Sequence, residues 1–449
     1  MKKLRIGCGA GCSYDRLEPA IELVEKGELD YIVFECLAER TIADNQQQKL
    51  KDPSKGYTPM LEVRMRSILK QAKENGVKIV TNMGAANPKS AIDLILKIAK
   101  DLEITNIKIA MVSGDDITNK LDKYKDIVMW QSTTPLGELH GEILSANVYL
   151  GAEGIKEALD NGADIVVTGR VADVALFVGP IMHEFKWTEK DLYKIGQATL
   201  LGHLLECGGQ ITGGYFADPG YKDVDNLHIL GHPIAVIDET GDFVVTKVPG
   251  SGGEVSLRTC KEQLLYEITD PSCYITPNSI VDFTNVVFKQ LEKDVVLVTG
   301  AMSKGAPHTY KVNIGYHDCY IGEGEVSFGG LNSLPRAKMC ADIIEKRLKI
   351  VGANIEEYRI DYLGYNSLYK TNISDVFAPK KHSEIRLRIS GRTKTYEDAM
   401  LIAQEFDYLY TNGPAGSSGI ESRVRKVLSI GAIIISKKDV TTETTYWEV

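Results

Sequence analysis

The sequence predicts an α/β protein, with a parallel, doubly wound (Rossmann-like) sheet domain over residues 1–275 and a smaller α+β domain over residues 276–449. Three observations predict it. A chain of 449 residues exceeds what one ordinary core holds. Its first half alternates short apolar runs with amphipathic helical segments, which is typical of parallel strands covered on both faces by helices. Beyond about residue 275, β-branched runs with period two take over, which is typical of strands in an α+β layer.

The first predicted unit is an apolar strand over 3–9 followed by a helix over 17–27, whose apolar residues recur at helical spacing and stop at Gly27. The same alternation then repeats along the chain. The strands are expected at 29–36, 77–84, 107–116 and 163–170, and the helices at 59–76, 88–103, 151–162, 171–185 and 189–207.

The second predicted domain combines period-two strands with two helices. Strands are expected within 279–300, 308–330, 384–391 and 431–440, and helices at 333–352 and 395–410. We expect this domain to close over the strand ends of the first domain through the loop at 411–418.

Composition restricts the class of partner. Hydrophobic residues make up 43% and charged residues 25%, and the net charge of −9 is spread without a basic block, which argues against nucleic acid or an anionic membrane as partner. No signal-peptide pattern and no run near 18 apolar residues occurs. The 8 cysteines lack the spacing of a disulfide framework. We therefore predict a cytoplasmic protein that binds a small molecule and forms a homo-oligomer, as metabolic enzymes commonly do.

Charged residues follow the predicted strands at their carboxyl ends, where open α/β sheets bind ligands. Charges are tolerated at such a cleft but costly inside the sheet. The predicted catalytic residues are Asp15, Glu35, Glu39, Arg170 and Asp173. General acid and base chemistry is expected from Asp15, Glu35, Glu39 or Asp173, with Arg16, Arg40 or Arg170 adjusting the carboxylate pKa values and binding a carboxylate or phosphate. Asn82 and Asn87 follow the third strand, and Asp115 and Asp116 the fourth. The alternative is that individual members are helix caps or surface pairs.

Glycine-rich loops are the second group of candidate ligand contacts. The loop 7–16 resembles a dinucleotide fingerprint but has Cys12 where the third glycine belongs, and the loops 247–256 and 411–423 do not match the nucleoside-triphosphatase motif. Their backbone amides suit an anion, although tight turns are the alternative. The predicted ligand-binding residues, besides the arginines and asparagines above, are Gly9, Gly11, Gly84, Lys247, Gly250, Gly252, Gly253, Gly413 and Gly416.

His203 and Cys207 lie four residues apart on one predicted helix, a spacing that suits a metal or a Cys/His nucleophile. The carboxyl end of a helix, however, raises a thiol pKa, which argues against Cys207 as nucleophile. Glu206, Tyr215 and Asp218 are better placed to contribute polar groups. The sequence has no C-x-x-C pair and no H-E-x-x-H helix, so no metal site is predicted.

Five strings resemble the acyclic terpene utilisation (AtuA-like) family, and the resemblance covers nearly the full length. They are "DRLEPAIELVEKGELDYIVFECLAERT", "VTNMGAANP", "VTGRVADVAL", "GHLLECGGQITGGYFADPG" and "NGPAGSSG". The family takes its name from a bacterial pathway that degrades acyclic terpenes as coenzyme A thioesters, so the resemblance implies a branched acyl-CoA as ligand. It supplies no catalytic residues to carry over.

Three functions follow as alternatives. The first is an enzyme, a hydratase, dehydratase or related lyase that acts on a branched acyl-CoA by carboxylate acid/base chemistry, with coenzyme A as part of the substrate and no other cofactor. The second is a noncatalytic acyl-CoA-binding accessory subunit of a carboxylase or dehydrogenase pathway. The third is a nucleotide-dependent enzyme, which the broken fingerprint at Cys12 disfavours.

Overall fold

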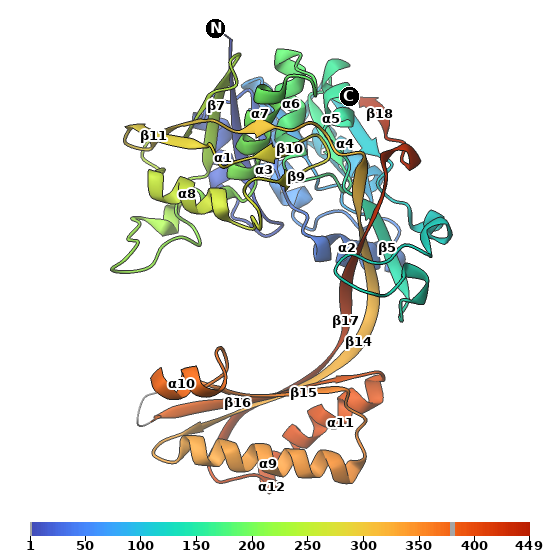
Figure 1. The fold of residues 1–449 in the computed structure, drawn as a ribbon, viewed down its shortest axis with the longest axis vertical. Helices are drawn as coiled ribbons and strands as arrows, with labels where there is room; N and C mark the ends of the chain where they lie inside the picture. The colour runs from blue at the N-terminus through green and yellow to red at the C-terminus, as the bar shows by residue number, and fades with distance from the viewer. Residues whose placement is uncertain (1, 378–381) are drawn as a thin grey trace. The chain divides into compact units, whose positions relative to one another are not determined.

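The computed structural model describes residues 2–377 and 382–449, and the chain divides into two compact units. Unit 1 contains Met1–Leu139, Ile143–Gly315 and Ile430–Val449, and unit 2 contains His140–Glu142 and Tyr316–Ser429. The long strands β14 (Thr309–Gly329) and β17 (Ser417–Ser436) each belong to both units (Figure 1). These bounds differ from the predicted ranges 1–275 and 276–449, because residues 276–315 and 430–449 fold with unit 1.

Unit 1 is built on a mixed sheet of ten strands. The central strands run parallel in the order β1, β2, β3, β6, β4, and antiparallel strands extend the sheet on both sides. The parallel strands are β1 (Lys3–Ala10), β2 (Tyr31–Phe34), β3 (Lys78–Thr81), β6 (Ile165–Thr168) and β4 (Lys108–Ser113). The antiparallel strands are β7 (Pro233–Asp238), β8 (Phe243–Lys247), β12 (Val295–Thr299) and β11 (Val287–Glu292) beyond β1, and β18 (Glu443–Glu448) beside β4.

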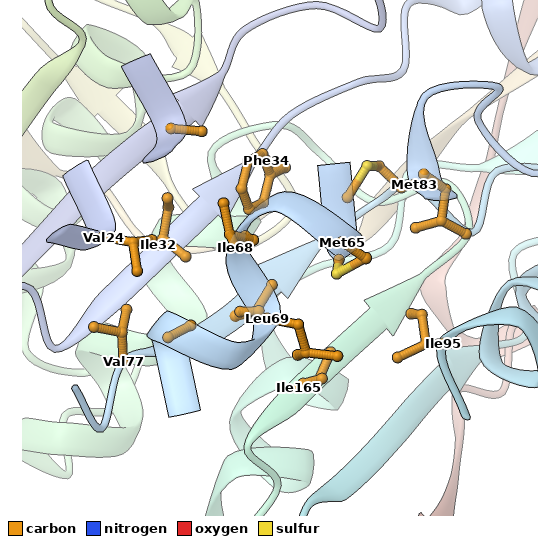
Figure 2. Close-up of a cluster of buried hydrophobic side chains, with 14 of the residues drawn as sticks. Val24, Ile32, Phe34, Met65, Ile68, Leu69, Val77, Met83, Ile95 and Ile165 are labelled. Atoms are coloured by element: carbon orange, nitrogen blue, oxygen red, sulfur yellow. The ribbon is translucent and has the colours of Figure 1, made fainter. Parts of the chain in front are cut away.

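Helices cover the parallel strands on both faces. Ile32 and Phe34 of β2 belong to a buried cluster with side chains of three helices, and Figure 2 shows them beside Ile68. These helices are α1 (Glu18–Lys26), α3 (Leu61–Glu74) and α4 (Pro88–Asp101). Tyr31 and Val33 alternate with the two cluster residues and are also buried, so they face the other side of the sheet. There α6 (Ala175–Phe185) contacts β1 and β2 and packs between α5 (Glu153–Asp160) and α7 (Leu192–Leu205).

The prediction of an α/β fold is confirmed, but the sheet is mixed instead of parallel throughout. All parallel neighbours lie on one side of β1, and the antiparallel β7 lies on its other side, so the strand order does not establish a Rossmann-like doubly wound arrangement. Two strands within 279–300, β11 and β12, extend this sheet, and Val296 of β12 pairs with Val245 of β8. The segment Ile280–Asp282 forms β10 instead, which pairs with β9 (Tyr274–Ile275) and β13 (Met302–Ser303) in a separate three-stranded sheet.

Unit 2 is an α+β layer. Its sheet has the order β15, β16, β14, β17, with β15 at Glu357–Leu363 and β16 at Glu384–Thr393. The helices α9 (Ser333–Val351) and α11 (Tyr396–Asp407) pack on one face, where Phe328, Leu387 and Phe406 are buried together. Shorter helices are α10 (Thr371–Phe377) and α12 (Leu409–Asn412). The expectation that this unit closes over the strand ends of unit 1 stays a prediction.

Among the described residues, the helices are all too short or too polar to span a bilayer.

Candidate functional site

A cleft of about 920 Å³ opens in unit 1 at the carboxyl ends of β1, β2 and β6. It lies where an open sheet presents its strand-end loops to a ligand, and its volume is within the range of small-molecule sites. Its lining includes all five predicted catalytic residues together with charged and aromatic groups from later segments. The lining residues are Gly11, Cys12, Asp15, Glu35, Leu37, Ala38, Glu39, Arg40, Tyr149, Arg170, Asp173, Glu206, Cys207, Gln210, Tyr266, Glu267, Lys311 and Ile430.

Glu35 is the buried carboxyl group at the end of β2, with 7% of its surface exposed. Its Oε1 accepts hydrogen bonds from the backbone N–H of Leu37 at 2.8 Å and from Nδ2 of Asn82 at 2.8 Å. Asn82 in turn accepts from the backbone N–H of Cys36 at 2.7 Å, so it joins the ends of β2 and β3. Burial raises the pKa of Glu35 to about 7, against the opposing effects of Arg170 and these hydrogen bonds. This carboxyl group can therefore both donate and accept a proton near neutral pH.

Arg170 follows β6 and is almost fully buried, with 1% exposed. Its guanidinium donates from Nε and Nη2 to the carbonyl of Val171 at 2.8 and 2.6 Å, from Nη1 to the carbonyl of Leu37, and from Nη2 to Asp173. It also lies 4.4 Å from the ring centroid of Tyr149. A guanidinium has five N–H bonds, so within the described chain one, on Nη1, remains for a ligand. Arg170 thus supplies positive charge beside Glu35, but with one N–H group left it cannot bind an anion through two parallel hydrogen bonds.

Asp115 supports Arg170 from the end of β4. Its Oδ2 accepts from the backbone N–H of Arg170 and from Nδ2 of Asn147, each at 2.9 Å. Burial raises the pKa of Asp115 to about 6. Gly169 is needed here, since a Cβ at this position would lie 2.5 Å from Oδ1 of Asp115.

Asp15 engages the first glycine loop. Its Oδ2 accepts from the backbone N–H groups of Gly11 at 2.7 Å and Cys12 at 3.1 Å, so the carboxylate takes the place that an anionic ligand would take in a phosphate loop. A Cβ on Gly11 would lie 2.2 Å from the carbonyl carbon of Cys207, and one on Gly9 would lie 2.4 Å from the Phe34 ring. Close packing therefore accounts for both glycines.

Another part of the cleft lining comes from the carboxyl end of α7 and from the residues after α8 (Leu257–Leu265). Glu206 and Cys207 lie at this end of α7. Burial raises the pKa of both the Glu206 carboxyl and the Cys207 thiol, and Glu206 adds to the effect on Cys207. Cys207 is therefore held as a neutral thiol, in keeping with the argument against it as nucleophile.

The remaining charged pair lies at the more exposed rim. Glu39 begins α2 (Glu39–Lys51), and its Oε1 contacts Nζ of Lys311 and lies 3.4 Å from the Tyr149 hydroxyl. Arg40 is further out, with 60% of its side chain exposed and Nε at 3.9 Å from Asp44.

Several predicted ligand contacts lie outside this cleft. Arg16 donates to the carbonyls of Leu227 at 3.3 Å and His228 at 3.1 Å, and together with Gly250 it lines a separate cleft of about 530 Å³. Lys247 is buried, donates to the carbonyl of Ser251 at 2.7 Å and lies 3.5 Å from Asp294.

Other members of the predicted set have structural contacts. Asn87 caps α4 by accepting from the backbone N–H of Ser90 at 3.4 Å. Gly84 and Gly252 pack closely against backbone. A Cβ added to Gly84 would lie 2.5 Å from the carbonyl oxygen of Thr168, and one added to Gly252 would lie 2.1 Å from that of Asn226. Gly253 has a φ of +79°, which glycine adopts readily. Gly413 and Gly416 belong to unit 2.

Sequence reasoning missed Tyr149, Tyr266, Glu267 and Lys311 as lining residues. None of them follows a strand that was predicted to end at the cleft, so a search for charged residues after predicted strands could not find them. Within the described ranges, no cluster of three or more His, Cys, Asp or Glu side chains is arranged to hold a metal ion.

Comparison with known proteins places the chain in a family. No curated protein and no solved structure matches it. A family model described as "Acyclic terpene utilisation family protein AtuA" matches residues 4–446, which include the whole cleft. The resemblance of the five sequence strings is thereby confirmed, and the chain belongs to the acyclic terpene utilisation family AtuA.

Proposed function

We propose that this protein is a lyase of the hydratase or dehydratase type that acts on a branched acyl-CoA, with Glu35 as a general acid/base. The observation that carries the proposal is the buried Glu35 carboxyl group, whose pKa lies at about 7, beside the buried Arg170 in a cleft at the strand ends.

Dehydration of a 3-hydroxyacyl thioester needs two proton transfers. A base removes the proton from the carbon next to the carbonyl, and an acid protonates the hydroxyl group, which leaves as water. Hydration runs the same steps in reverse. Glu35 can supply one of the two groups because both of its protonation states are populated near pH 7. Arg170 stabilises negative charge that develops on the thioester oxygen.

The charges of the cleft favour a neutral reacting group over a free carboxylate. The lining has six carboxyl groups and three cations. Each cation is already engaged, Arg170 by Asp173, Lys311 by Glu39 and Arg40 by Asp44. A free acid would find no cation without a carboxylate partner among these residues and would be repelled, whereas a thioester carries no charge at the acyl end. The coenzyme A phosphates would then lie outside the acidic part of the cleft.

Ligand stabilisation tests the proposal. We expect a branched acyl-CoA to raise the thermal unfolding midpoint, because a ligand at 100 times its dissociation constant stabilises by about 2.7 kcal/mol. The corresponding free acid, free coenzyme A, NAD and ATP serve as comparisons. Stabilisation by a nucleotide, or by the free acid as strongly as by the thioester, would contradict the proposal. Stabilisation by the thioester without turnover would favour an accessory binding subunit.

A further inference from the structure

His203 lies behind the cleft wall on α7 and is buried, with 3% of its side chain exposed. Its Nε2 is 3.1 Å from the carbonyl oxygen of Leu264, and its Nδ1 is 3.4 Å from Oε1 of Glu206. The ring lies 5.1 Å from Tyr274 and 5.8 Å from Phe283, measured between centroids. The imidazole is therefore fixed in orientation, with one nitrogen toward the backbone and the other toward the cleft wall.

This arrangement determines the tautomer of His203. A carbonyl oxygen accepts hydrogen bonds only, so Nε2 must carry a proton. The hydrogen bond between Nδ1 and Glu206 then requires one further proton, which sits either on the Glu206 carboxyl or on the imidazole. In either state the pair as a whole is neutral.

The other oxygen of Glu206 is the one available to a ligand. Oε2 is buried and has no hydrogen-bond partner within the described residues, while Glu206 itself lines the cleft. A buried carboxyl oxygen without a partner is costly unless a ligand or another group satisfies it.

Apart from Glu35 and Glu206, the carboxyl groups of the cleft are less suited to proton transfer. Asp15 accepts from Gly11 and Cys12, Asp173 pairs with Arg170, and Glu39 pairs with Lys311. Glu267 is exposed to solvent.

We infer that Glu206 is, beside Glu35, the second proton-transfer group of the cleft, and that His203 is the positioning residue and proton acceptor of Glu206. This inference rests on the proposed function. A substrate proton moves to Oε2 of Glu206 while the proton on Oε1 moves to Nδ1 of His203. The substrate gains one negative charge, the Glu206–His203 pair gains one positive charge, and Glu206 remains a neutral acid that can return its proton.

The groups around Glu206 favour a proton on the Glu206–His203 pair. Burial raises the pKa of Glu206, Glu267 acts in the same direction, and His203 and Arg170 act against it. The effect of Glu206 on the pKa of Glu35 is also upward, so the two cleft carboxyl groups disfavour being ionised together. Tyr274 also faces the pair, and burial raises the pKa of its hydroxyl.

Two histidine variants separate the positioning role from simple packing. In His203→Gln, the side-chain amide can still donate to the Leu264 carbonyl but no longer reaches Glu206. The matched control is His232→Asn, because His232 is also buried and its Nδ1 lies 3.1 Å from the carbonyl of Cys8. Asparagine keeps a donor at that position.

The first measurement is the ¹⁵N spectrum of the imidazole groups in the full chain without ligand, with His203→Gln used for assignment. We expect His203 to be protonated at Nε2, and we expect Glu206→Gln to shift the Nδ1 resonance more than the Nε2 resonance. Protonation of Nδ1 alone, or an Nδ1 resonance unchanged in Glu206→Gln, would overturn the pairing.

The second measurement is the pH profile of turnover with the branched acyl-CoA. His203→Gln should lower kcat by roughly 10- to 100-fold and displace one limb of the profile, whereas His232→Asn should leave the profile in place. An unchanged profile in His203→Gln would overturn the role of His203 while leaving the proposed function intact. Absence of turnover in the unmodified protein, with the expected Nδ1 resonance, would instead contradict the proposed function and the proton-transfer role that rests on it, while the pairing of Glu206 with His203 would stand.

Discussion

Glu35→Gln is expected to lower turnover of the branched acyl-CoA by about 10²- to 10⁴-fold, the usual contribution of a general acid/base. The substitution keeps a side-chain oxygen that accepts from Leu37 and Asn82, so the loss arises from the missing proton transfer and not from a collapsed site. Turnover at saturating substrate measures it. The control is Glu74→Gln at the exposed end of α3, which should retain full activity.

The same variant is expected to be more stable than the parent protein above neutral pH. The pKa of Glu35 is raised in the folded state, so the unfolded chain releases this proton first as pH increases, and folding stability falls between about pH 4.3 and the folded value of about 7. Glutamine removes this cost, which is about 3 to 4 kcal/mol once the group is ionised, because each unit between the unfolded and folded pKa values corresponds to about 1.36 kcal/mol. Denaturant midpoints near pH 5 and pH 8 measure the difference. Equal stability of the two proteins at both values would contradict the raised pKa.

Arg170→Leu is expected to destabilise the fold by about 3 to 5 kcal/mol, because it removes a buried charge that several groups depend on. The carbonyls of Leu37 and Val171 would lose their donors, and Asp173 would lose its ion-pair partner. The shift in denaturant midpoint of unit 1 measures the effect.

Arg66→Leu is the matched control for this prediction. Arg66 makes two ion pairs, at 3.0 Å to Glu62 and 2.8 Å to Asp101, but its side chain is 35% exposed. Ion pairs between exposed side chains contribute little to stability, so we expect Arg66→Leu to leave the denaturant midpoint nearly unchanged. If the two leucine variants lost similar stability, the prediction that the buried contacts of Arg170 stabilise unit 1 more than exposed ion pairs do would be wrong.

The rule that ligand-binding residues follow the strands of an open sheet located six of the eighteen residues that line the cleft. It identified Glu35 and Arg170 correctly as cleft residues because each directly follows an apolar run, and parallel strands end at the same edge of the sheet. It could not show that the Arg170 guanidinium donates three hydrogen bonds to protein carbonyls. Nor could it show that the Asp15 carboxylate accepts from the backbone N–H groups of its own glycine loop. Those contacts depend on side-chain distances that spacing along the chain does not encode.

The sequence also did not predict which distant strands pair with one another. The strands β7 and β8 form an antiparallel hairpin, and β18 pairs with β4 although more than three hundred residues separate Ser113 from its partner Glu443. Local periodicity identifies a strand but not its neighbour. The mixed character of the sheet therefore followed from tertiary pairing alone.

The sequence by itself determined the α/β class, the alternation of strands and helices in the first half, and the family, because these follow from local periodicity and from long specific strings. Tertiary structure decided which strand lies beside which, including the position of β6 between β3 and β4. It also brought Glu206 to the cleft lining and His203 within hydrogen-bond distance of Glu206 and of the Leu264 carbonyl, since burial and hydrogen-bond geometry exist only once distant segments have packed together.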